Sequence, residues 1–220
     1  MQRKTVASLQ QKQTRQLLPT MLNKRRYSLK KILNRYMGLS FSQYQPDMTS
    51  ADLHDAGLGE ALAATQKEIL PAELNKMCTV EPVSIEVRGV AIAFDEEVSF
   101  SPYRYLSLQS PVYSLPILPR LQHYAAYCQH YTPQQNHPIS EAVEEALRKR
   151  ALQDFMQDML PAVFHMPLIR LSVYDRFTDG DAYCCLGSIL EADNERFYLS
   201  IADRINNELE RVDQLFINTL

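Results

Sequence analysis

Apolar and polar residues alternate most clearly between Val83 and Asp95, with an Arg88-Gly89 pair in the middle of the pattern. This arrangement predicts a β-hairpin with a two-residue turn. In that register Glu86 lies opposite Ala91, and Asp95 ends the second strand on its less apolar face. Residues 168–174 predict a further strand, which carries an arginine in its interior.

Apolar residues recur at helical spacing in most other parts of the chain. Residues 38–50 are polar and predict a linker, and residues 175–181 predict a turn. We therefore expect an α+β fold with a small mixed sheet, in which the hairpin is flanked by helices, and a basic helical N-terminal arm. The expected domains are the arm and linker at 1–46 and the α+β body at 47–220. Helices are predicted over residues 9–37 (broken near Pro19), 51–70, 103–109, 121–131, 140–160, 182–190 and 195–216.

The composition limits the class of protein. With 220 residues, 45% hydrophobic and 22% charged, the chain can bury one sizeable core. The four cysteines lack C-x-x-C spacing, and no apolar run is long enough for a signal sequence or a membrane span. We expect a soluble, cytoplasmic protein with no membrane partner. The chain also lacks a glycine-rich phosphate loop and a dinucleotide fingerprint, which argues against ATPases and dehydrogenases.

Charge is divided very unevenly along the chain. Ten basic residues and no acidic residue precede Asp47, whereas the remainder holds thirteen bases and 26 acids, a net −13. A basic segment of this kind is typical of proteins that neutralise phosphates, so nucleic acid, DNA rather than RNA, is the expected partner. Two alternatives stay open: the arm docks on the chain's own acidic body, or it binds a protein or a membrane surface. The cations expected to contact phosphate within the second helix of the arm are Lys24, Arg25, Arg26, Lys30, Lys31 and Arg35.

The densest group of carboxylates follows the hairpin directly, at Asp95-Glu96-Glu97. If the chain stays extended, Asp95 and Glu97 project to one side about 7 Å apart, a spacing that suits a shared Mg²⁺. Glu60, from the preceding helix, is a candidate third carboxylate. Arg170 lies within a predicted strand, where it is expected either to pair with Asp95 or Glu97 or to contact phosphate. A solvated turn is the non-functional alternative for the three acids.

Two segments carry a resemblance to a known fold. Residues 94–100 (FDEEVSF), followed by Tyr103-Arg104-Tyr105-Leu106, and residues 167–175 (PLIRLSVYD) resemble the restriction-endonuclease-like fold, particularly its short-patch-repair relatives. The first segment is also similar to a Phe-Asp-Glu-Glu-x-x-Phe motif of an uncharacterised bacterial family. The chain departs from these patterns at Ser99, where the relatives have histidine, and at Glu97, where the wider nuclease pattern has lysine.

The resemblance implies one of two functions. In a Mg²⁺-dependent endonuclease, Asp95 and Glu97 hold the metal, Glu60 assists, and Arg104 or Arg170 steadies the phosphate that is cut. In a degenerate relative the same fold only binds nucleic acid, which fits the loss of an imidazole base at Ser99. A non-enzymatic interaction subunit or inhibitor that acts through the acidic body remains a third hypothesis.

Overall fold

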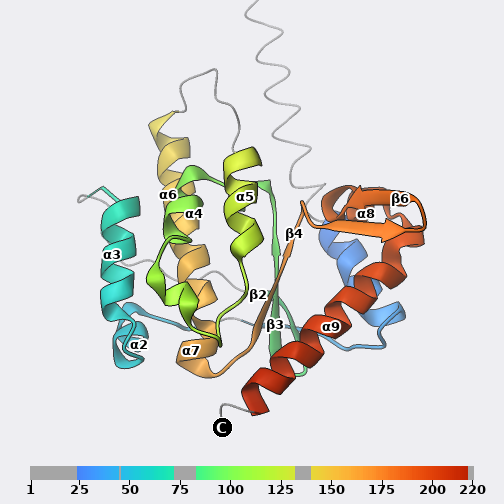
Figure 1. The fold of residues 1–220 in the computed structure, drawn as a ribbon, viewed down its shortest axis with the longest axis horizontal. Coiled ribbons are helices and arrows are strands. Elements are labelled where there is room, and N and C mark those ends of the chain that lie inside the picture. The colour runs from blue at the N-terminus through green and yellow to red at the C-terminus, as the bar shows by residue number, and fades with distance from the viewer. Residues whose placement is uncertain (1–23, 45, 72–82, 132–139, 218–220) are drawn as a thin grey trace, which may run out of the picture. The chain divides into compact units, whose positions relative to one another are not determined.

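The computed structural model describes residues 24–44, 46–71, 83–131 and 140–217 (Figure 1). Predictions for residues 1–23 lie outside this part of the chain. The contacts divide the chain into two compact units, Met1–Ser40 with Val173–Ile205, and Phe41–Ser172 with Asn206–Leu220. The first break is close to the boundary expected at residue 46, but the return of 173–205 to the N-terminal unit was not predicted from the sequence.

The larger unit contains a four-stranded sheet in the order β1-β2-β3-β4. β1 pairs antiparallel with β2, β2 antiparallel with β3, and β3 parallel with β4. The predicted hairpin is confirmed, since Glu86 lies opposite Ala91 and both Arg88 and Gly89 have positive φ, as a two-residue hairpin turn requires. The strands are β1 (Ser42–Tyr44), β2 (Val83–Val87), β3 (Val90–Asp95) and β4 (Leu168–Ser172).

Helices fill the connections of this unit and gather beside the sheet (Figure 1). The helix predicted over residues 51–70 is two helices, because Gly57 takes φ +75° between them. A capping box of Thr49 and Asp52 starts the first of these, and the Ser101 hydroxyl caps α4 at the Arg104 amide. The elements are α2 (Ser50–Asp55), α3 (Gly59–Ile69), η2 (Glu97–Ser99), α4 (Pro102–Ser107), η3 (Pro111–Ser114), α5 (Gln122–Tyr131), α6 (Glu141–Asp158) and α7 (Leu160–Phe164).

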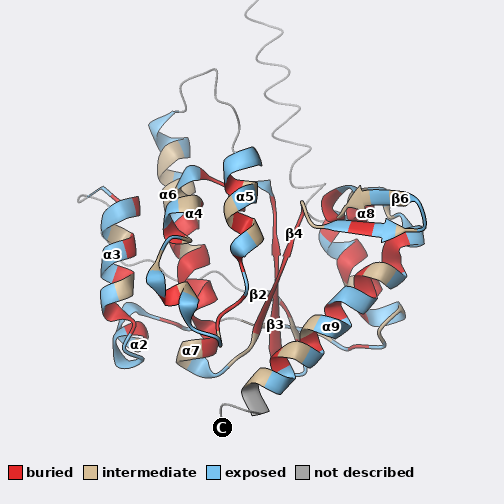
Figure 2. Ribbon diagram, viewed as in Figure 1, coloured by how far each residue is buried: buried red, intermediate tan, exposed pale blue. Residues whose placement is uncertain are grey.

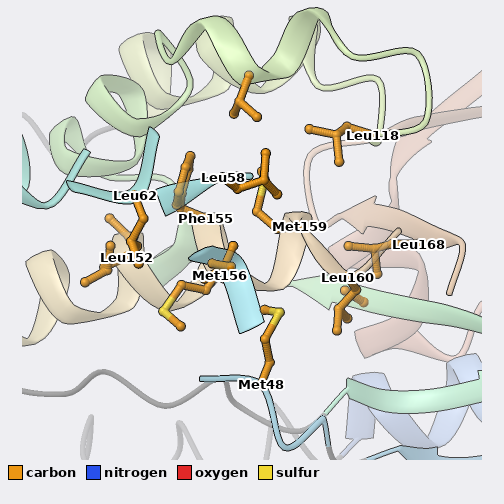
Figure 3. Packing of buried hydrophobic residues seen from close by; sticks show 14 of the residues in the cluster. Met48, Leu58, Leu62, Leu118, Leu152, Phe155, Met156, Met159, Leu160 and Leu168 are labelled. Carbon is orange, nitrogen blue, oxygen red and sulfur yellow. The ribbon is translucent and has the colours of Figure 1, made fainter. Parts of the chain in front are cut away.

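The core of the larger unit forms where α6 meets the sheet and α3. Leu152 and Phe155 of α6, with Met159 directly after this helix, belong to a cluster that also contains Leu62 of α3 and Leu168 of β4 (Figure 3). Every residue of β3 is buried, as Figure 2 shows. A side chain on the helix-facing side of β3 or β4 is therefore removed from water, whether it is apolar or charged.

The smaller unit contains residues 24–35 as a helix and a second, two-stranded sheet. Residues 175–185 were predicted as a turn and the start of a helix, and this was wrong: they form an antiparallel hairpin with Asp179 opposite Ala182. The pairing buries Phe177, and Gly180 supplies the positive φ of the turn. The elements are β5 (Arg176–Asp179), β6 (Ala182–Cys185), α8 (Leu186–Ala192), η4 (Glu195–Phe197) and α9 (Tyr198–Ile217), which passes into the larger unit after Ile205.

No helix in the described ranges is both long and apolar enough to cross a membrane.

Candidate functional site

Asp95 is the last residue of β3 and is only 1% exposed. Its Oδ1 accepts a hydrogen bond from Nη1 of Arg170 at 2.6 Å, and its Oδ2 accepts one from the Tyr124 hydroxyl at 2.7 Å. Arg170 lies opposite Ala93 in the parallel pairing of β3 with β4 and so shares a sheet face with Asp95. The pairing of Arg170 with Asp95, one of the alternatives that the sequence left open, is therefore present.

Asp158, at the end of α6, is the second carboxylate of this site and is fully buried. Its Oδ1 accepts from Nε of Arg170 at 2.5 Å, and its Oδ2 accepts from Nη2 of Arg104 at 2.6 Å and from the Tyr113 hydroxyl at 2.5 Å. Asp158 therefore joins two buried arginines that are far apart in the sequence.

Asp154 and Gln157, also on α6, complete the shell around Arg170. Nη2 of Arg170 donates to the Gln157 side-chain oxygen at 2.9 Å and to the Asp154 carbonyl at 3.0 Å. The Asp154 carboxylate forms an ion pair of 3.1 Å with Arg150. Three aspartates are thus matched by three arginines, and such matching is what allows charges to stay ionised away from water. We call these residues the buried network: Asp95, Arg104, Tyr113, Tyr124, Arg150, Asp154, Gln157, Asp158 and Arg170.

The pKa shifts of Arg170 and Asp154 favour the charged form of each side chain. Burial by itself lowers the pKa of Arg170, but Asp158 and Asp95 more than compensate and hold it well above its ordinary value. Burial raises the pKa of Asp154, yet Arg150 and Arg170 outweigh that effect and the pKa is lowered. Burial also raises the pKa of Tyr113, which stays a neutral hydrogen-bond donor. Arg170 and Asp154 are thus held in their charged forms by the opposite charges around them.

The structure does not bring the proposed metal ligands together. The extended chain ends at Asp95, and Glu97 begins the short helix η2 with its side chain exposed, so the joint projection of Asp95 and Glu97 expected from the sequence is wrong. Glu60 lies exposed in the first turn of α3. Within the described ranges, no three His, Cys, Asp or Glu side chains are placed to hold a metal ion. A cation at Asp95 would have to share this carboxylate with the Arg170 guanidinium and the Tyr124 hydroxyl.

Arg104 and Arg170, the expected phosphate ligands of the body, are each 1% exposed at the side chain. Arg104 also donates to the Ser107 hydroxyl and to the Tyr113 oxygen, both at 3.2 Å. In this arrangement neither guanidinium can reach a phosphate in solution. Sequence reasoning missed Asp154 and Asp158, although their spacing of four residues on the apolar face of α6 is a signal for buried acids that need partners.

The helix at residues 24–35 buries Leu29, Ile32 and Leu33 completely. Two of its cations pair with acids of the same unit. Arg25 contacts Glu191 at 3.1 Å, and Lys31 contacts Asp193 at 3.0 Å and also Glu195. Internal docking, which the sequence left open as an alternative to nucleic acid, therefore accounts for Arg25 and Lys31.

Asp193 is the centre of this second set of contacts. Its carboxylate accepts hydrogen bonds from the Tyr198 hydroxyl, from Lys31, and from the Ser28 hydroxyl at 3.2 Å. The Tyr198 bond, followed by the Lys31 bond, lowers the pKa of Asp193, and Lys31 likewise lowers the pKa of Glu195. The lowered pKa favours the ionised form of both acids, which hold the helix in place by charge in addition to its apolar packing.

The remaining cations of this helix have a different environment. Lys24, Arg26 and Arg35 are exposed, and Lys30 is half-buried. Tyr27, between them in the sequence, is 68% exposed. Arg25 and Lys31 therefore have counter-ions within the unit, whereas Lys24, Arg26 and Arg35, which we call the outer cations, are exposed to solvent.

Comparison of the chain with protein-family models, with curated proteins and with solved structures gave no match. The function is therefore argued from this geometry.

Proposed function

We propose that this chain is a nucleic-acid-binding protein that contacts the phosphate backbone, most favourably that of DNA, through the outer cations of the helix at residues 24–35. The observation that carries the proposal is that some cations of this helix pair with acids of the same unit while others are exposed. Arg25 and Lys31 anchor it to Glu191, Asp193 and Glu195, whereas the outer cations face solvent. A helix already anchored presents its charges without a folding cost at binding.

The outer cations are suited to phosphate by their number and exposure. Lys24, Arg26 and Arg35 lie on just over three turns of helix, and none of them is buried. Exposed lysine and arginine side chains bind a nucleic-acid backbone largely by releasing its condensed counter-ions. The four further bases at Arg3, Lys4, Lys12 and Arg15 add to the positive charge of the same N-terminal segment.

We further propose that the body is a nuclease-like domain without metal-dependent catalysis at Asp95. Asp95, Arg104 and Arg170, three of the residues on which the resemblance to the restriction-endonuclease-like fold rests, lie in one buried network. The two Asp95 oxygens are already engaged by Arg170 and Tyr124, which supports a structural role for this carboxylate. Mg²⁺-dependent cleavage is the competing hypothesis, and it requires the metal ion to bind a carboxylate that already pairs with a guanidinium.

The test is the salt dependence of nucleic-acid binding by the full chain. Lys24→Gln, Arg26→Gln and Arg35→Gln in one variant should weaken the binding of a fluorescent oligonucleotide. The slope of log K against log salt should become shallower by about 2 to 3, since each neutralised phosphate contributes about 0.7 to 0.9.

A matched control removes three exposed cations of the larger unit, Lys67, Arg120 and Lys149, by the same change to glutamine. Both variants lose the same net charge, so a difference between their affinities for the oligonucleotide reports a specific role of the helix. The proposal is overturned if the unaltered chain does not bind at about 50 mM salt, or if the two triple variants lose affinity equally.

A further inference from the structure

Tyr27 has an environment that packing does not explain. It is 68% exposed on the helix at residues 24–35, while Leu29, Ile32 and Leu33 of the same helix are fully buried. A tyrosine ring usually stabilises a fold by burying most of its area, and this ring buries little. Packing within this unit therefore leaves most of the Tyr27 surface available to a ligand.

Helical spacing places charged and polar groups around the Tyr27 ring. Lys24 precedes it by three residues, and Lys30 and Lys31 follow it by three and four, which are the spacings of neighbours on one helix face. Asn34, one turn farther on, is exposed. Lys31 is held by Asp193 and Glu195, whereas Lys24 is exposed to solvent beside the ring.

We propose that Tyr27 is a stacking platform for a base of single-stranded nucleic acid, with the exposed Lys24 on an adjoining phosphate. This inference rests on the proposed function and specifies its substrate class. In a duplex both faces of each base are covered by its neighbours, whereas a single strand can place an exposed base on an aromatic ring. The combination of an exposed ring with a flanking cation fits that ligand, because the ring takes the base and the cation takes the backbone.

The exposed ring also distinguishes this ligand from a bare polyanion. Phosphate contacts alone need cations and gain nothing from tyrosine, so they would hold single strands and duplexes by charge density alone. Stacking adds a contribution that depends on the ring and only on unpaired bases. Removing the ring must therefore change the preference for single strands and leave the charge contribution in place.

The experiment measures the binding of the full chain to a fluorescent 20-nucleotide oligo-thymidine and to a duplex of the same length. We expect the unaltered chain to prefer the single strand. Tyr27→Ala should weaken that binding about 5- to 150-fold, the range known for loss of one stacked base, and change duplex binding less than about twofold. Tyr27→Phe should retain the preference because the ring remains.

Tyr183→Ala is the matched control, since Tyr183 of β6 is 72% exposed but has its cation–π partner, Arg176, on the adjacent strand. The inference is overturned if Tyr27→Ala binds the single strand as tightly as the unaltered chain, or if it weakens both ligands equally. In either case nucleic-acid binding itself stands. If the unaltered chain binds neither ligand, the proposed function fails and this inference fails with it.

Discussion

Replacing Asp95 by asparagine tests whether this carboxylate is structural or catalytic. The change keeps the size of the side chain but removes the charge that Arg170 contacts at 2.6 Å. In the buried network the negative charge compensates a buried guanidinium, so the variant should be less stable. A carboxylate held beside other acids for metal binding would behave in the opposite way, because its neutralisation relieves repulsion between like charges.

The size of the effect follows from the contacts. A hydrogen bond to a charged group contributes about 1.5 to 3 kcal/mol, and breaking a buried ion pair costs about 3 to 5 kcal/mol. Arg170 keeps its bond to Asp158 in the variant, so the loss should lie between these limits, at about 2 to 4 kcal/mol. Since domains are stable by only about 5 to 15 kcal/mol, this is a large fraction of the total.

Urea denaturation followed by circular dichroism measures this loss. With a slope of about 2 to 3 kcal/mol per molar, the midpoint for Asp95→Asn should fall by about 1 M. Glu97→Gln is the matched control, because Glu97 is exposed two residues away and its replacement should change stability by less than about 0.5 kcal/mol. Arg170→Met should cost at least as much as Asp95→Asn, and the double variant should cost less than the sum of the two.

An unchanged or higher midpoint for Asp95→Asn would refute this reasoning. A higher midpoint would mean that the Asp95 charge destabilises the folded protein, as charges do in many catalytic sites. Cleavage of DNA by the unaltered chain in the presence of Mg²⁺ would then decide in favour of the nuclease hypothesis.

Two further predictions concern the helix at residues 24–35 and the core. The pKa values of Asp193 and Glu195 are lowered in the folded protein, so their contribution to docking is present above about pH 4 and is lost as the pH falls through the lowered values. Residues 24–35 should therefore lose protection from amide hydrogen exchange in acid, beyond the change in the intrinsic exchange rate. A Lys31→Gln variant should already be less protected at pH 7 and should lose less further protection in acid. Equal losses in acid for the two proteins would contradict this prediction. Phe155→Ala should lower the free energy of unfolding by about 3 to 5 kcal/mol, because Phe155 is 1% exposed. Val143→Ala, on the same helix and 50% exposed, should change the free energy of unfolding by less than about 1 kcal/mol. Equal effects of the two changes in urea denaturation would show that α6 is not packed as described.

The sequence by itself determined the features that depend on neighbouring residues. The β2–β3 hairpin follows from alternation around Arg88-Gly89, and the burial of Leu29, Ile32 and Leu33 follows from their spacing on one helix. The pattern failed at residues 175–185, where the four-residue strands β5 and β6 are too short for alternation to separate them from a turn and a helix.

Only the tertiary structure decided the partners of the charged residues. Arg170 meets Asp95 across 75 positions of sequence, and Lys31 meets Asp193 across 162. A carboxylate in a sequence carries the same charge whether it will hold a metal, face water or neutralise an arginine. Which of these it does depends on the groups that folding removes from water together with it, and for Asp95 those groups are supplied by α5 and β4, elements distant in the chain.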